Sequence, residues 1–198
     1  MRRLIEPIVE TQLERELKQP RLWIEFSELL TVCSFLFGCC TCWLLWKTFG
    51  WMTVLQTFFV LVVSLCGENY VSVKGYYRYT ELNCCFIGMV PLWIPFMWIT
   101  VIQGSLFLSS LVYPIGLMTL LVTAVISTLL DLLIIEPYFC RRRRLWSWSP
   151  VEEGYFDFIP EKFNQFTAPP GNYITWFIFP FVSNALLLLL DHQQVLFT

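Results

Sequence analysis

Charged residues are scarce in this sequence. Only 14% of the 198 residues are Asp, Glu, Lys or Arg, whereas 57% are apolar. A soluble domain of this size has about a quarter of its residues charged, so too little polar surface remains here to cover a water-exposed globule. The net charge of −2 gives no electrostatic support to a nucleic-acid partner.

Residues for metal or cofactor chemistry are also scarce. The single histidine is His192, and Cys39, Cys40 and Cys42 lack the CxxC spacing of a metal site. An Asp-rich diphosphate motif, paired histidines for iron or haem and a Gly-rich nucleotide loop are all missing. These absences disfavour a metal site, redox chemistry and prenyl transfer, and they leave acid–base chemistry on an apolar substrate open.

Long apolar runs are abundant, and each approaches or exceeds the roughly 20 residues that cross a bilayer. The sequence predicts an all-α, polytopic membrane helix bundle over residues 28–198, with about five transmembrane helices. The expected spans are 29–46, 51–66, 86–112, a fourth from after Pro114 to near Ile135, and 173–190. Polar connections are expected at 67–85 and 136–171. The lipid bilayer is therefore the first predicted partner.

Residues 1–27 are polar and show a helical pattern. Leu4, Ile8, Leu13 and Leu17 lie near helical spacing, with charged residues between them. This pattern predicts a short amphipathic helix lying on the membrane surface. A loosely ordered charged leader is an equally good interpretation.

The placement of Lys and Arg predicts the orientation of the bundle. With the N-terminus in the cytoplasm, twelve of the thirteen basic residues fall on the inside, including Arg141–Arg144, and only Lys47 falls outside. We therefore expect a cytoplasmic N-terminus.

Two of the predicted spans carry a polar stripe that ends in a carboxylate. Thr119, Thr123, Ser127 and Asp131 recur every four residues, and so share one helix face. Thr53, Thr57 and Ser64 lead in the same way towards Glu68. The hydroxyls are most simply contacts between helices, whereas two carboxylates delivered to the same membrane face indicate function.

Glu136 is a third carboxylate close to the same face. It precedes Pro137, where the fourth helix is expected to stop. In an α-helix, Glu136 would lie about 140° from Asp131, so the two need not share a face.

The segments between the spans resemble those of a known membrane family. The residues that carry the resemblance are Glu68, Gly75–Thr80, Val90–Pro95 and Trp98, and then Asp131, Glu136–Pro137, Trp146–Trp148, Tyr155–Phe156, Ile159–Pro160, Asn172–Tyr173 and Trp176. In order and spacing they are similar to motifs of the carotenoid biosynthesis membrane family, which includes the carotenoid 1,2-hydratases such as bisanhydrobacterioruberin hydratase. The match departs from the family pattern at residues 161–171, where the family connection is shorter.

The resemblance implies hydration of a terminal C=C of an acyclic carotenoid, a lyase reaction that needs no cofactor. Burial of a carboxylic acid disfavours its charged form. Glu68 and Asp131 could therefore supply the acid and position the water, with Glu136 as the alternative carboxyl. Aromatic rings could stabilise the tertiary cation by about 1–2 kcal/mol each. The implied substrate-binding residues are Tyr77, Tyr79, Trp98, Trp146, Trp148, Tyr155, Asn172 and Trp176.

Two other interpretations stay open at this point. A non-catalytic accessory subunit of a multi-protein membrane complex could retain the same scaffold and bind other membrane subunits. A relative of the membrane-bound lycopene cyclases would use similar protonation chemistry on the same type of isoprenoid end group.

Overall fold

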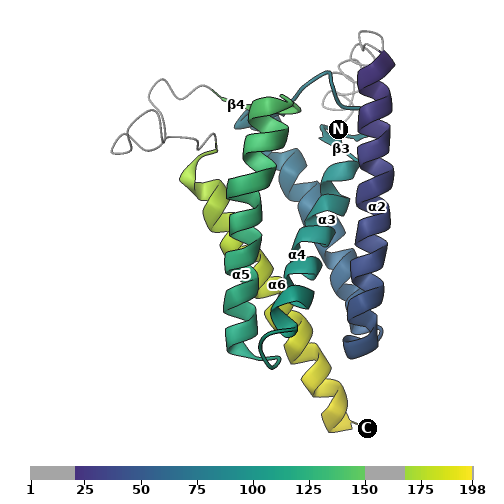
Figure 1. Cartoon of the computed structure of the whole chain (residues 1–198), viewed down its shortest axis with the longest axis vertical. Helices are drawn as coiled ribbons and strands as arrows, with labels where there is room; N and C mark the ends of the chain where they lie inside the picture. The colour runs from purple at the N-terminus through teal and green to yellow at the C-terminus, as the bar shows by residue number, and fades with distance from the viewer. Residues whose placement is uncertain (1–20, 150–167, 198) are drawn as a thin grey trace.

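The computed structural model describes residues 21–149 and 168–197 and contains five long helical segments (Figure 1). They are α2 (Arg21–Phe49), α3 (Met52–Val73), α4 (Trp93–Ser110), α5 (Leu117–Leu130) with its continuation η1 (Asp131–Arg142), and α6 (Pro170–Phe197). The predicted surface helix within residues 1–27 and the predicted contact Tyr155 lie largely or wholly outside the described residues.

All five segments are long and apolar enough to cross a membrane. Large apolar side chains cover their outer faces, as at Phe58, Leu117 and Leu133, each about two-thirds exposed. An exposed apolar surface of this extent suits lipid and not water. The protein is therefore a multi-pass integral membrane protein, and the prediction of a five-helix bundle is confirmed.

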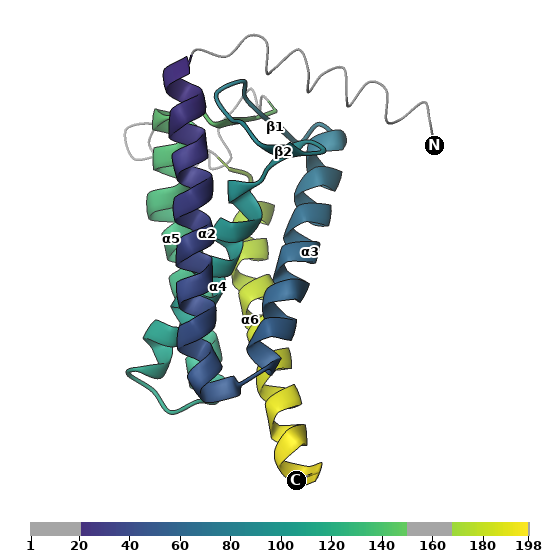
Figure 2. The same ribbon diagram turned by 90° about the vertical axis from the view of Figure 1, so that its right-hand side faces the viewer.

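Helix α4 lies at the centre of the bundle. It is the most buried of the five spans and packs against α2, α3, α5 and α6 (Figure 2). Its buried residues include Trp93, Trp98 and Gln103. Helix α3, which carries Glu68, and helix α5, whose continuation η1 carries Asp131 and Glu136, both contact α4. Side chains from α3 and η1 can therefore reach one shared interior.

Four short strands lie at one end of the bundle. They are β1 (Tyr77–Tyr79), β2 (Phe86–Ile87), β3 (Val90–Pro91) and β4 (Trp146–Trp148). Strand β1 pairs with β4 antiparallel, and β2 pairs with β3 as a hairpin. The expectation that the third span begins at Phe86 is wrong, because residues 86–91 form this hairpin and the helix begins at Trp93.

Two predicted helix ends also differ from the structure. Helix α3 continues past Cys66 to Val73, so Glu68 is a helical residue and not part of a connection. The fourth span does not stop before Pro137 but continues to Arg142 as a π-helix. Proline lacks the N–H and conflicts with the regular α-helical ladder, and here the chain widens its turns instead of ending the helix.

Amide side chains join three helices in the middle of the bundle. Gln56 of α3 donates its Nε2–H to Asn184 Oδ1 of α6 at 2.7 Å, and Gln103 of α4 donates to Thr57 Oγ1 of α3 at 2.8 Å. On the other stripe, Thr123 donates to Ser109 Oγ at 3.1 Å. These contacts agree with the interpretation of the hydroxyl stripes as contacts between helices.

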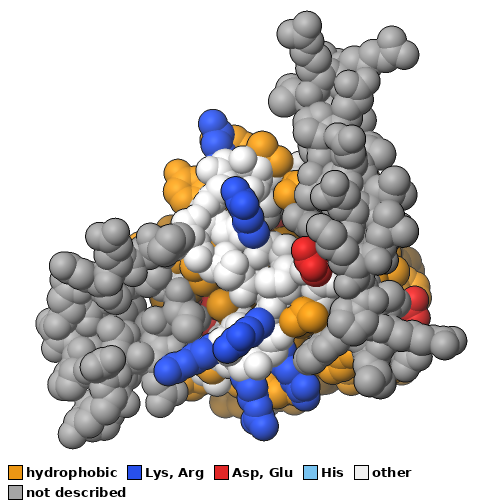
Figure 3. Space-filling view, turned by 90° about the horizontal axis from the view of Figure 1, so that it is seen from above, with side chains coloured by type: hydrophobic (Ala, Val, Ile, Leu, Met, Phe, Trp, Pro, Cys, Tyr) orange, Lys and Arg blue, Asp and Glu red, His pale blue; other side chains and the backbone are white. Residues whose placement is uncertain are grey.

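Basic side chains gather at the end that carries the strands. Lys and Arg side chains are prominent on this face (Figure 3). Lys74 caps α3, Arg78 lies in β1, and Arg141–Arg144 lie at the end of η1. Lys47, in the last turn of α2, lies at the opposite end, over the ring of Trp43 at 3.9 Å. The cytoplasmic placement of the strand end stays a prediction from this charge asymmetry.

Asn83 ties the strand end to the central helix. It is fully buried, donates its Nδ2–H to Leu145 O at 2.6 Å, and accepts the indole N–H of Trp93 at 3.0 Å. One amide thus connects the segment before β4 to the first turn of α4.

We expect Asn83→Ala to lower the free energy of unfolding by about 2 kcal/mol or more. The change leaves the buried indole N–H of Trp93 without its acceptor, which costs about 1–3 kcal/mol. It also removes one of the donors to the Leu145 carbonyl, which keeps the N–H of Thr80 at 2.9 Å. Denaturant unfolding in mixed micelles measures the effect, with the exposed Glu81→Ala as the matched control. Equal stability of both variants would contradict the role given to Asn83.

The orientation is tested with single cysteines placed at the two ends of a cysteine-free variant. Arg78→Cys is expected to react with a membrane-impermeant maleimide only from the cytoplasmic side. Lys47→Cys is expected to react only from the opposite side. The reversed labelling pattern would overturn the predicted orientation.

Candidate active site

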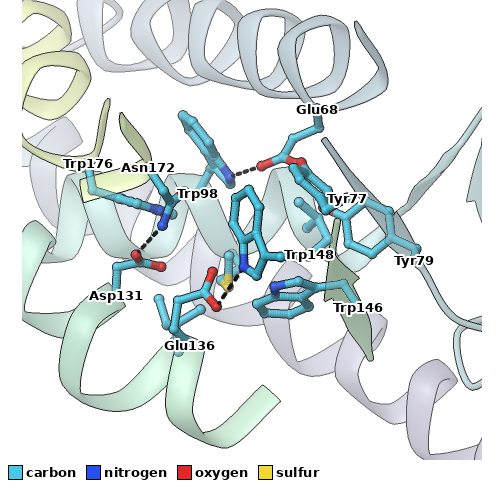
Figure 4. Close-up of a pocket in the computed structure, with 13 residues that line it drawn as sticks. Glu68, Tyr77, Tyr79, Trp98, Asp131, Glu136, Trp146, Trp148, Asn172 and Trp176 are labelled. Atoms are coloured by element: carbon cyan, nitrogen blue, oxygen red, sulfur yellow. Dashed lines mark hydrogen bonds between the residues drawn. The ribbon is translucent and has the colours of Figure 1, made fainter. Parts of the chain in front are cut away.

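A pocket lies between the membrane helices and the strand pair β1–β4 (Figure 4). Its walls come from α3, α4, η1, α6 and both strands. The thirteen lining residues are Glu68, Tyr77, Tyr79, Ile94, Met97, Trp98, Asp131, Ile135, Glu136, Trp146, Trp148, Asn172 and Trp176. They combine three carboxyls with six large aromatic side chains, and none of them is a lysine or arginine.

Glu68 enters the pocket from the last turns of α3 and is held by two donors. Tyr79 donates its hydroxyl to Glu68 Oε2 at 2.8 Å, and Trp98 donates its indole N–H to Oε1 at 3.0 Å. Burial and the adjacent Glu68 carboxyl raise the pKa of Tyr79 well above its ordinary value. The tyrosine therefore keeps its proton and serves as a hydrogen-bond donor to Glu68.

The π-helical turns of η1 bring Asp131 and Glu136 to the same side. Each backbone bond of a π-helix links residues five apart, so the fifth residue after Asp131 lies nearly above it. The α-helical spacing left open whether these two carboxyls share a face, and the π-helical geometry of η1 decides it. Both side chains are almost fully buried and line the pocket.

Each of these carboxyls has a donor from another element. Asn172, near the start of α6, donates its Nδ2–H to Asp131 Oδ2 at 2.7 Å. Trp148 of β4 donates its indole N–H to Glu136 Oε2 at 3.2 Å. Glu68 thus approaches from α3, and Asp131 and Glu136 approach from η1 (Figure 4). Each of the three carboxyls is oriented by an N–H or O–H group.

The strand pair forms an aromatic wall over the pocket. Tyr77 pairs with Trp148 and Tyr79 with Trp146, whereas the intervening pair, Arg78 and Ser147, is exposed. The rings contact across the strands, with centroids 4.8 Å apart for Tyr77 and Trp148. Because successive strand residues point to opposite faces, this register turns four rings inward and keeps the arginine outside.

The structure brings together the residues that the sequence singled out. Ten of the eleven predicted site residues line this pocket, and the remaining one, Tyr155, lies outside the described residues. Their catalytic and binding roles stay predictions. Sequence reasoning missed Ile94, Met97 and Ile135, although Ile94 and Ile135 lie one helical turn from Trp98 and Asp131 and could have been found by that spacing.

The carboxyls are not arranged for a metal ion. In the parts of the chain that the structure describes, no group of three His, Cys, Asp or Glu side chains is placed to hold one. Each carboxyl instead meets a tryptophan, tyrosine or asparagine donor. The arrangement suits proton transfer beside an apolar, π-rich wall, which is the environment that a carbocation requires.

Comparison with known proteins agrees with the motifs. No curated protein and no solved structure matches the chain significantly. The family described as carotenoid biosynthesis protein matches residues 28–197, a range that includes every pocket residue. The chain therefore belongs to the carotenoid biosynthesis protein family.

Proposed function

We propose that this protein hydrates a terminal C=C of an acyclic carotenoid at the pocket between the helices and the β1–β4 wall. The observation that carries the proposal is the meeting of Glu68 from α3 with Asp131 and Glu136 from η1 inside one aromatic pocket. Membership of the family supports a role in carotenoid biosynthesis. The particular reaction rests on the chemistry of these side chains.

Hydration of such an alkene requires a proton donor and a separate proton acceptor. We assign the donor to Asp131, whose proton adds to the less substituted carbon of the double bond. The electron pair of the double bond forms the new C–H bond and leaves a tertiary cation on the neighbouring carbon. Asn172 fixes one oxygen of Asp131 and so orients the carboxyl.

The cation is formed among aromatic rings. Trp146, Trp148 and Tyr77 line the pocket. The face of each such ring stabilises a positive charge by about 1–2 kcal/mol where water is excluded. No lysine or arginine belongs to the lining. The rings therefore favour formation of the cation without offering a nucleophile stronger than water.

Glu68 takes the opposite role to Asp131. Both of its oxygens accept hydrogen bonds, from Tyr79 and Trp98, which is the arrangement of a carboxylate held as an acceptor. As a water oxygen bonds to the cation, Glu68 accepts the released proton. The sum is addition of one H and one OH across the bond. Transfer of this proton from Glu68 back to Asp131 restores both groups, and we assign Glu136, on the same side of η1 as Asp131, as the relay for it.

We expect Glu68→Gln and Asp131→Asn each to lower product formation at least about 100-fold, because positioned acid–base groups contribute about 10²–10⁴-fold. Turnover of an acyclic carotenoid in detergent or vesicles, followed by chromatography, measures the effect. The exposed Glu81→Gln, which lies outside the pocket, is the matched control. Wild-type turnover in both pocket variants would refute the assignment.

The same pocket suits a cyclase, because cyclisation of this end group also starts with protonation. The two reactions differ in the group that captures the cation, which is water in hydration and a double bond of the same chain in cyclisation. Hydration in ¹⁸O-labelled water is expected to give a product that carries one ¹⁸O atom by mass spectrometry. A ring-closed product without ¹⁸O would replace hydration with the cyclase reaction, and absence of any product from folded protein would favour the accessory-subunit interpretation.

A further inference from the structure

The pocket is too small for a complete carotenoid. The free space among its side chains is about 320 Å³, even when its open mouth is included. A carotenoid is long enough to extend across most of the roughly 30 Å hydrocarbon layer of a bilayer. The pocket therefore holds one end of such a chain, and the rest of the chain must lie elsewhere.

The strand end of the bundle is an unsuitable place for the rest of the chain. The inward rings of β1 and β4 close the pocket on that side, and the outward face carries the exposed Arg78 and Arg144. An apolar chain that left in this direction would be exposed to water beside basic side chains, which forfeits its burial free energy.

Helices α3 and α6 both line the pocket, α3 with Glu68 and α6 with Asn172 and Trp176. The two helices contact each other away from the pocket, where Gln56 meets Asn184 at 2.7 Å and the rings of Phe59 and Phe179 stack at 6.0 Å. From there they diverge towards the strand end, as both ribbon views show (Figures 1 and 2).

Each of these two helices carries a glycine next to its polar pocket residue. Gly67 precedes Glu68 on α3, and Gly171 precedes Asn172 on α6. A Cβ built at either position would meet no atom of the described residues within 4 Å. The positions next to Glu68 and Asn172 therefore carry no side chain, and the space beside each glycine is open among the described residues.

A continuous row of aromatic rings leads from the pocket to the contact between α3 and α6. Trp98 and Trp176 line the pocket with ring centroids 4.7 Å apart, and Trp98 is 5.3 Å from Phe179. Phe179 in turn stacks on Phe59, which is 39% exposed on the outer face of α3. We name these four rings the aromatic row.

We infer that the isoprenoid tail of the substrate leaves the pocket sideways between α3 and α6 and lies along the aromatic row, with its far end in the bilayer. The ligand class rests on the proposed function, and the route rests on the divergence of α3 and α6, the open space at the two glycines and the aromatic row. A conjugated polyene is flat and π-rich, so it stacks on such rings, and each aromatic contact of this kind contributes about 0.5–1.5 kcal/mol beyond burial.

This path is tested with two substitutions and two substrates. Phe59→Ala removes the outermost ring of the row, and Gly67→Leu fills the open space next to Glu68 with a bulky side chain. Phe58→Ala is the matched control, because Phe58 is the neighbouring residue on α3 and is 67% exposed. Each variant is assayed with a long acyclic carotenoid and with a short acyclic isoprenoid that carries the same end group.

We expect Phe59→Ala to lower kcat/KM for the long substrate about 2- to 10-fold, the ratio that corresponds to loss of one aromatic contact. Gly67→Leu should lower it about 10-fold or more. Turnover of the short substrate should change less than about 2-fold in both variants, and Phe58→Ala should resemble the wild type with both substrates. Equal effects on the two substrates, or no effect on either, would overturn the tail path.

A binding measurement separates failure of the path from failure of the reaction. The long polyene is expected to quench the tryptophan fluorescence of the folded protein, with weaker binding in Phe59→Ala than in Phe58→Ala. Binding that depends on Phe59 without any hydrated product would refute hydration and retain the path. Hydration with affinity that is independent of Phe59 would refute only the path.

Discussion

Polar groups inside a bilayer must find their hydrogen-bond partners within the protein, because lipid offers none. This chain places Glu68, Asp131 and Glu136 inside helices that its composition assigns to the membrane. Their partners, Trp98, Asn172 and Trp148, come from three other elements. The pairing requires α3, η1, α4, α6 and β4 to converge at one depth, and the remaining architecture follows from that requirement.

The strand pair β1–β4 supplies hydrogen-bond donors to the carboxyls from one end of the bundle. Strands β1 and β4 supply two of the donors to the carboxyls, Tyr79 and Trp148, and they separate the pocket from the exposed Arg78. Asn83 links this wall to α4. The short strand pair therefore limits the access of water to the pocket and keeps the charge of Arg78 outside it.

The middle of the bundle meets the same constraint in a different way. Gln56, Gln103 and Asn184 are almost fully buried and satisfy one another across three helices. Amides that bond to each other hold α3, α4 and α6 together away from the pocket. From this junction α3 and α6 diverge towards the pocket (Figures 1 and 2).

The sequence by itself determined the class of the protein. Hydropathy and the scarcity of charge predicted five spans, since the bilayer imposes both the length and the composition of a crossing helix. The loop motifs predicted the family and ten residues of the pocket. Those motifs are local in the chain, so they can be read without knowing how the helices pack.

Only the tertiary structure decided how the pocket residues relate to one another. Hydropathy placed Glu68 in the polar connection 67–85 and Phe86 in a span, whereas in the structure α3 continues to Val73 and Phe86 belongs to the β2–β3 hairpin. The shared face of Asp131 and Glu136 depends on π-helical turns around Pro137, which α-helical spacing rules do not foresee. The register of Tyr77 against Trp148 joins segments about seventy residues apart. Such pairings depend on packing between distant segments, and no local pattern in the chain encodes them.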